Sequence, residues 1–180
     1  MIRIDSELVY PAAASVCALV GSFFDVKSRR VPNLLTGPSI VFGLLLHLSM
    51  GGWRQMAISA AAGLICGLVF LVFYLAGGMG AGDVKLITAV GCICGLHYIV
   101  GLLAFTAIAG GIMAAALALA SGRVKQTILN VVELVSHHRS AGLTPHPEIN
   151  VLNASTLRLP YALAITAGCA LTLYLQGVQR

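Results

Sequence analysis

A succession of long apolar blocks, almost free of charge, is the feature that most restricts how this chain can fold. Of its 180 residues, 58% are hydrophobic and only 9% are charged, whereas about a quarter of the residues in a typical soluble domain are charged. The blocks are close to the roughly 20 apolar residues that a helix needs to cross the hydrocarbon core. We therefore predict an all-α integral membrane protein that forms one polytopic domain over residues 1–180.

The apolar blocks divide into about six predicted transmembrane helices. Their approximate limits are residues 8–24, 33–50, 56–76, 83–96, 99–120 and 159–175. The polar segment 25–33 is expected to form a hairpin between the first two helices. Residues 51–55, which include two glycines and an interfacial tryptophan, are expected to form a tight turn between the second and third.

The only sizeable polar stretch, about residues 121–158, contains one further predicted helix. Valines and an isoleucine recur in it at helical spacing, with polar residues on the other faces: Val124, Ile128, Val131, Val132 and Val135. This pattern is typical of an amphipathic helix that lies on a membrane surface. The following segment, from His137 to Pro147, is predicted to be a loop.

The formal charge of +5 does not indicate nucleic-acid binding, because the basic residues are distributed between apolar blocks and do not cluster on one polar face. Alternate loops instead carry very different numbers of them. One side holds eight: Lys27, Arg29, Arg30, Lys85, Arg123, Lys125, Arg139 and Arg158. The other holds Arg3, Arg54 and Arg180. The positive-inside rule predicts that the first side is cytoplasmic.

No metal or cofactor is expected. All five cysteines fall inside apolar blocks without CxxC spacing, so they are predicted to be buried free thiols. No HExxH motif is present for a zinc protease, and no histidine accompanies a serine in a recognisable nucleophile motif. His137, His138 and His146 lie in the polar stretch, where we do not expect a metal site.

Two isolated aspartates are the most informative polar residues. Asp25 and Asp83 are the only carboxylates between Glu7 and Glu133, and each lies at the edge of a predicted transmembrane helix on the same predicted side. An isolated carboxylate at such a depth is a functional-site hypothesis by default. The simpler alternatives are a helix N-cap for Asp83 and a solvated interfacial residue for Asp25.

Two observations favour a functional role. Asp25 follows the end of the first helix, where the helix dipole disfavours negative charge. Four glycines in residues 77–82 leave little side-chain bulk beside Asp83, so that another chain could approach closely. Two neighbouring carboxylates cannot both ionise cheaply and would share a proton. The charged member could then activate water while the protonated member donates to a peptide carbonyl, which is hydrolysis by general acid–base catalysis.

At these residues the chain closely resembles the type IV prepilin peptidases, a branch of the GxGD aspartic proteases of membranes. Residues 25–36, DVKSRRVPNLLT, resemble the first-aspartate loop of that family, and residues 78–86, GMGAGDVKL, resemble its second aspartate motif. The resemblance implies that Asp25 and Asp83 are the catalytic pair. It further marks five motif positions at the active-site loops: Gly80, Gly82, Lys85, Pro32 and Asn33.

The resemblance implies an endopeptidase that removes the basic leader from prepilin or pseudopilin precursors. Its partners would be these precursors and membrane lipid, and its active site would face the cytoplasm from the bacterial inner membrane. Longer members carry an extra cytoplasmic region, often with paired CxxC motifs, that is associated with N-methylation. Nothing in this sequence corresponds to that region. The chain therefore resembles the short enzymes of tight-adherence (Flp-type) pilus systems, and no methylation is expected.

Two other function classes stay open at this stage. A small helical transporter or channel subunit could bind a proton or cation with the same carboxylates, although transporter sites usually lie near the bilayer midplane. A non-catalytic assembly protein could use its glycines only for close helix packing. Nothing in the sequence indicates an oligomeric state.

Overall fold

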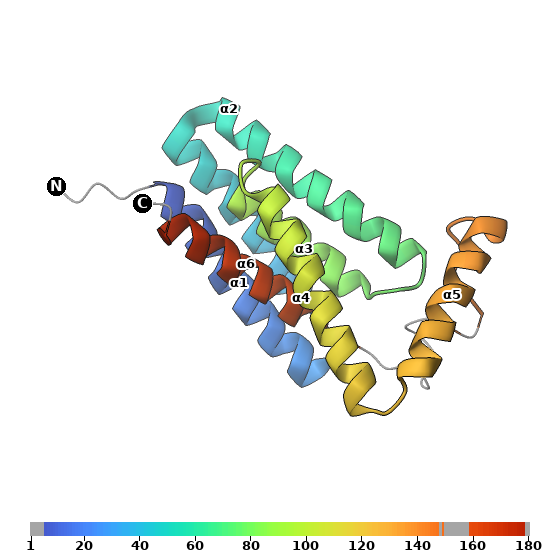
Figure 1. Ribbon diagram of the computed structural model, residues 1–180. Helices are drawn as coiled ribbons and strands as arrows, with labels where there is room; N and C mark the ends of the chain where they lie inside the picture. Colours follow the sequence, from blue (N-terminus) through green and yellow to red (C-terminus); the bar gives the residue numbers. More distant parts are fainter. Residues whose placement is uncertain (1–5, 148, 150–158, 179–180) are drawn as a thin grey trace.

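The computed structural model describes residues 6–147, 149 and 159–178, and within these residues the regular structure is entirely helical (Figure 1). The helices are α1 (Ser6–Ser28), α2 (Asn33–Leu75), α3 (Ala81–Cys94), α4 (Ile99–Ala120), α5 (Val124–Ala141) and α6 (Tyr161–Val178). The predicted all-α class is confirmed.

Four of these helices are long and apolar enough to cross a membrane: Leu8–Ser28 within α1, then α2, α4 and α6. The predicted count of about six spans is not confirmed. The predicted second and third spans belong to the single 43-residue helix α2. The predicted fourth corresponds to α3, which has 14 residues and at 1.5 Å per residue is only about 21 Å long.

Helix α2 is a hairpin with its bend at one residue. Gly52 has φ 71° and ψ −170°, which is outside the helical region, and glycine reaches a positive φ without steric cost. In Figure 1 the two arms of α2, residues 33–51 and 53–75, run side by side from this bend in opposite directions. The turn predicted over residues 51–55 is thus a sharp bend at Gly52, with helical residues directly before and after it.

Helix α3 packs between the two arms of α2 and is the most buried helix. From the first arm, His47 Nε2 lies 3.1 Å from the carbonyl oxygen of Ile93. From the second arm, the hydroxyl of Ser59 donates to the carbonyl oxygen of Cys92 at 2.6 Å. Since these contacts come from both arms, they fix the position of α3 along the hairpin.

Helices α1 and α6 pack on the rest of the bundle and on one another. The hydroxyls of Ser22 in α1 and Thr166 in α6 lie 2.6 Å apart. Gly21 in α1 is so close to α3 that an added β-carbon would lie 2.6 Å from Leu86 Cδ1. The end of α1 therefore lies beside the starts of α3 and α6, while the Gly52 bend, the start of α1 and the end of α6 lie at the opposite end of the bundle (Figure 1).

Three predicted boundaries are wrong. Helix α1 continues to Ser28, because the N–H of Arg29 still bonds to the carbonyl of Asp25 at 2.7 Å, so Asp25 lies in the last helical turn and not in a loop. Helix α3 begins at Ala81, before Asp83. Helix α5 continues to Ala141, so that the predicted loop from His137 starts later, at Gly142 with its φ of 70°.

The close approach of α2 to α3 gives a test of the packing. A β-carbon at Gly43 would lie 2.9 Å from backbone atoms of Cys92 and Ile93, which cannot rotate away. We expect Gly43→Ala to lower the free energy of unfolding in detergent by about 1–3 kcal/mol, as overpacking does. Gly37→Ala is the matched control, because no atom lies within 4 Å of its added β-carbon. Equal stability of the two variants would contradict this packing.

Candidate active site

The packing of α1 against α3 determines which residues meet at the end of the bundle. Gly21 contacts Leu86, and from this contact the two helices run in opposite directions. Asp25 lies about one turn after Gly21, and Asp83 lies about one turn before Leu86. The two aspartates are therefore brought to the same level, although 57 other residues separate them in the sequence.

The two oxygens of Asp83 have different surroundings. Oδ2 accepts a hydrogen bond from the backbone N–H of Gly80 at 3.3 Å, and the N–H of Asp83 bonds back to the carbonyl of Gly80 at 3.2 Å. Oδ2 thus stabilises the start of α3, but Asp83 is the third residue of this helix, and its N-cap is Gly80 and not Asp83 as the simpler alternative proposed. Oδ1 is buried and has no hydrogen-bond partner in the described part of the chain. A buried polar oxygen without a partner is costly, so this atom is available to a substrate or water.

Asp25 interacts with the start of α6. Its carboxylate accepts a hydrogen bond from the backbone N–H of Ala162, in the first turn of that helix. The first N–H groups of a helix have no partner within the helix, and its dipole places partial positive charge there. The partial negative charge at the end of α1 destabilises the Asp25 carboxylate. The N–H group and the partial positive charge at the start of α6 offset this destabilisation.

Asp83, in the first turn of α3, is outside the four candidate spans. Burial, followed by the negative charge of Asp25, raises the pKa of Asp83 from 3.8 to about 7, and the bond from Gly80 only partly opposes this. Among the described residues, neither aspartate forms an ion pair with a lysine or arginine. Unlike an ordinary aspartate, Asp83 can therefore hold a proton near neutral pH.

The predicted motif residues lie around Asp83 in supporting positions. Gly82 packs on the loop after α1, where an added β-carbon would lie 3.3 Å from the backbone nitrogen of Val31. Lys85 Nζ donates to Asn33 Oδ1 at 2.8 Å, which joins α3 to the start of α2. Pro32 precedes α2 as its N-cap residue. With the Gly80–Asp83 bond, these contacts hold the loop and the start of α3 together.

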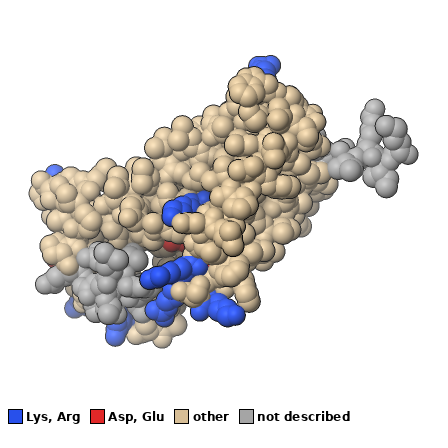
Figure 2. All heavy atoms as spheres, turned by 180° about the vertical axis from the view of Figure 1, so that it is seen from behind, with Lys and Arg blue, Asp and Glu red and all other residues tan. Residues whose placement is uncertain are grey.

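Basic side chains surround this end of the molecule. Figure 2 shows a small area of acidic atoms set back between lysine and arginine side chains. The basic residues of the segments that adjoin the aspartates are Lys27, Arg29, Arg30 and Lys85, and all four are exposed. The site is therefore an acidic recess with a positively charged edge.

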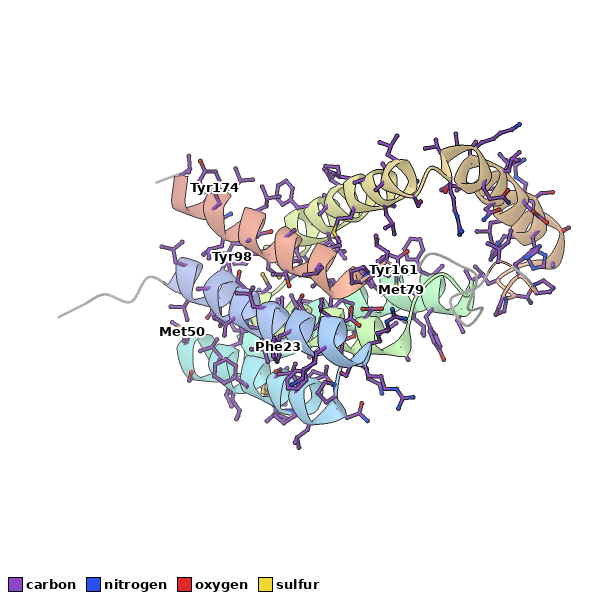
Figure 3. All side chains as sticks on the ribbon, turned by 90° about the horizontal axis from the view of Figure 1, so that it is seen from below. Phe23, Met50, Met79, Tyr98, Tyr161 and Tyr174 are labelled. Atoms are coloured by element: carbon purple, nitrogen blue, oxygen red, sulfur yellow. The ribbon has the colours of Figure 1, made fainter. Side chains whose placement is uncertain are left out.

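Sequence reasoning missed the contribution of α6. Tyr161, its first residue, lies close enough to Asp83 for the charges of the two groups to interact. Figure 3 shows Tyr161 beside Met79, at the end of the bundle where the glycine loop precedes α3. The sequence position of Tyr161 could have indicated this contribution. Tyr161 directly follows the polar stretch, and that end of the last apolar block is on the same predicted side as Asp25 and Asp83.

The residues considered for metal or redox chemistry are not assembled into a site. No group of three or more histidine, cysteine, aspartate or glutamate side chains within the described residues has the geometry to hold a metal ion. The five cysteines are buried and free. The rings of His137 and His146 meet edge to face near the end of α5, with centroids 4.8 Å apart.

The unusual protonation of Asp83 can be measured. A raised pKa means that the folded state binds this proton more tightly than the unfolded state. The resulting stabilisation is complete below the ordinary pKa of 3.8 and is lost as the pH rises through about 7. We expect the Tm of the unaltered protein to fall between about pH 5 and about pH 8, and Asp83→Asn to flatten this profile.

The electrostatic interaction between the two aspartates has its own test. We expect Asp25→Asn to lower the pKa of Asp83, because one cause of the shift is removed, but to leave it above 3.8, because burial remains. The carboxyl band of Asp83 in infrared spectra, followed against pH, reports this change. An unaltered titration of Asp83 in Asp25→Asn would show that the two charges do not interact.

The chain was also compared with known proteins. A sequence model of the type IV leader peptidase family matches residues 12–115, more than half of the chain, and this segment includes both aspartates and all five other motif positions. It ends within α4, so α6 lies outside it. No curated protein and no solved structure matches the chain.

Proposed function

The chain belongs to the type IV leader peptidase family, and from this premise we propose that it is a membrane aspartic endopeptidase that removes the leader of Flp-type prepilins, with Asp25 and Asp83 as its catalytic pair. The single observation that carries the proposal is the buried, unpartnered Oδ1 of Asp83 beside a second carboxylate, in the part of the chain that the structure describes. The family match independently supports a protease.

The surroundings of the two aspartates suggest different roles for them. Asp83, with its pKa of about 7, supplies the acid, and Asp25, which accepts the N–H of Ala162, supplies the charged base. Asp25 removes a proton from water as the water oxygen attacks the carbonyl carbon of the scissile peptide, and Asp83 donates its proton to the carbonyl oxygen. The tetrahedral intermediate then collapses: the C–N bond breaks, the leaving nitrogen takes up the proton that Asp25 removed from water, and a hydroxyl group of the intermediate returns a proton to Asp83.

We propose that the site faces the cytoplasm from the bacterial inner membrane. Seven described lysines and arginines belong to segments at the end of the bundle that carries the aspartates: Lys27, Arg29, Arg30, Lys85, Arg123, Lys125 and Arg139. Arg54, next to the Gly52 bend, is the described basic residue of the opposite end. This asymmetry supports a cytoplasmic site by the positive-inside rule. A prepilin presents its leader at the same boundary.

Access for a peptide is supported by the glycine segment. Residues 76–80 join α2 to α3 without helical structure, and Gly78 and Gly80 add no side chains there. An extended substrate backbone can approach Asp83 closely only where such bulk is missing.

We propose that cleavage occurs without N-methylation, as expected from the absence of CxxC motifs.

Helix α5 is proposed to lie on the membrane surface at the same end. It follows α4 after only three residues, and none of its residues is buried. Its apolar side chains are exposed, Val132 to 62% and Ile128 to 59%. In Figure 1 α5 turns away from the direction of α4. A helix that directly follows a transmembrane helix and has an exposed apolar face is well suited to lie in the headgroup region of the bilayer.

The transporter alternative is less well supported. Both aspartates lie at one end of the bundle, and no third metal-binding side chain joins them among the described residues. A translocation pathway would need polar groups near the middle of the spans.

The catalytic pair is tested by cleavage of an epitope-tagged Flp-type prepilin co-expressed with this chain. We expect Asp25→Asn and Asp83→Asn each to lower the cleavage rate by roughly a hundred- to ten-thousand-fold, because each removes one proton-transfer group. Glu133→Gln should cleave like the unaltered protein, and chelators should not inhibit. Full processing by either aspartate variant would overturn the dyad, and strong inhibition by chelators would point to a metal instead.

The position of α5 is tested with a nitroxide label on an introduced cysteine, since the native cysteines are buried. In lipid vesicles we expect a label at Ile128 to be accessible to oxygen and a label at Gln126, on the opposite side of the helix, to be accessible to a water-soluble nickel reagent. Equal exposure of both labels to the nickel reagent would place α5 away from the bilayer.

A further inference from the structure

The first turn of α6 forms a third side of the site that holds the two aspartates. The bond between Ser22 and Thr166, at 2.6 Å, fixes the register of α1 against α6. From this contact, Asp25 lies about one turn further along α1, and Ala162 lies about one turn earlier in α6. The bond from the Ala162 N–H to Asp25 agrees with this register.

Tyr161, the neighbour of Ala162, lies near Asp83. Its ring is partly buried and packs against the hydrophobic core that includes Val31 and Met79, which come from the two loops beside the site. Tyr161 and Asp83 are close enough to interact electrostatically. In Figure 3 the Tyr161 side chain lies at the end of α6 beside Met79.

Two polar groups at this end of the bundle have no hydrogen-bond partner for one of their atoms among the described residues. Asp83 is only 8% exposed, and its Oδ1 makes no hydrogen bond there. The Tyr161 hydroxyl also forms no hydrogen bond with the described residues. Unlike Asp83 Oδ1, it is not completely buried. A carboxyl oxygen and a phenol that lie close enough to interact electrostatically, each with hydrogen-bonding capacity left over, can both bind one further molecule.

We infer that Tyr161 is a third catalytic side chain, whose hydroxyl donates a hydrogen bond to the carbonyl oxygen of the scissile peptide as that oxygen gains negative charge. The inference rests on the proposed function and adds to it a residue outside the segment that the family comparison matches. The hydroxyl keeps its proton throughout. Asp83 delivers the proton that the oxygen finally takes up, and Tyr161 stabilises the charge that develops before that transfer is complete.

A fixed ring is well suited to this role. A donor aimed in advance at the place where charge develops stabilises the transition state more than the ground state. The packing of the ring against the core holds the hydroxyl in place, and the surrounding apolar helices keep the local dielectric low, which strengthens its hydrogen bond.

The test uses Tyr161→Phe, which keeps the ring and removes only the hydroxyl. With purified full-length protein and a tagged Flp-type prepilin that the unaltered chain cleaves, we expect kcat to fall on the order of a hundredfold, with KM nearly unchanged. Tyr174→Phe is the matched control. Tyr174 is in the same helix, near its other end, and is 65% exposed, so its variant should retain full activity.

Two further measurements separate the hydroxyl from other roles of the side chain. If Tyr161→Phe is fully active and only Tyr161→Ala is impaired, the ring acts by packing alone and the inference is wrong. We expect the pH titration of Asp83 to be the same in Tyr161→Phe as in the unaltered protein. A shifted titration together with lost cleavage would mean that Tyr161 acts through Asp83, which also overturns the inference.

Failure of this inference can be told apart from failure of the proposed function. If Asp25→Asn and Asp83→Asn cleave normally, the peptidase mechanism itself fails. If both are inactive and Tyr161→Phe cleaves as fast as Tyr174→Phe, the dyad stands and only the role of Tyr161 is lost.

Discussion

The contact between α1 and α3 is the constraint on which the rest of the structure depends. Gly21 lets Leu86 approach so closely that no side chain fits between them. This approach sets the register by which Asp25 and Asp83 reach the same end of the bundle, and it leaves Asp83 buried beside a second negative charge. Gly21, one helical turn before Asp25, thus contributes to the raised pKa of Asp83. The proposed roles of the two aspartates as acid and base depend on that pKa.

Much of this arrangement could be predicted from the sequence, because its signals are local. The helical class, the helix of the polar stretch and the two aspartates on one side all follow from hydropathy, spacing and isolated charge. The motif residues Gly82, Lys85 and Asn33 could be named from resemblance, but the contacts that give them structural roles were not predictable. The bond between Lys85 and Asn33 joins residues that are 52 positions apart, and no periodicity indicates such a pair.

The parts that sequence reasoning missed depend on tertiary structure. A hydropathy pattern does not distinguish a short buried helix such as α3 from a transmembrane one, because burial in protein and burial in lipid select the same apolar residues. The hydropathy pattern also fails to predict where helices end. Asp25 and most of residues 137–141 are polar, yet they belong to the last turns of α1 and α5. Tyr161 carried no motif, and only the packing of α6 against α1 brings it to the site.

The single-residue bend at Gly52 has a consequence for biosynthesis. At the end of the bundle away from the aspartates, the described connections are this bend and the short turn Gly95–Tyr98. Very little polar material therefore has to pass through the bilayer when the chain is inserted. In the orientation that we propose, with the aspartates on the cytoplasmic side, the two arms of α2 can enter as one unit, and Arg54 is the charged side chain between them that is carried across.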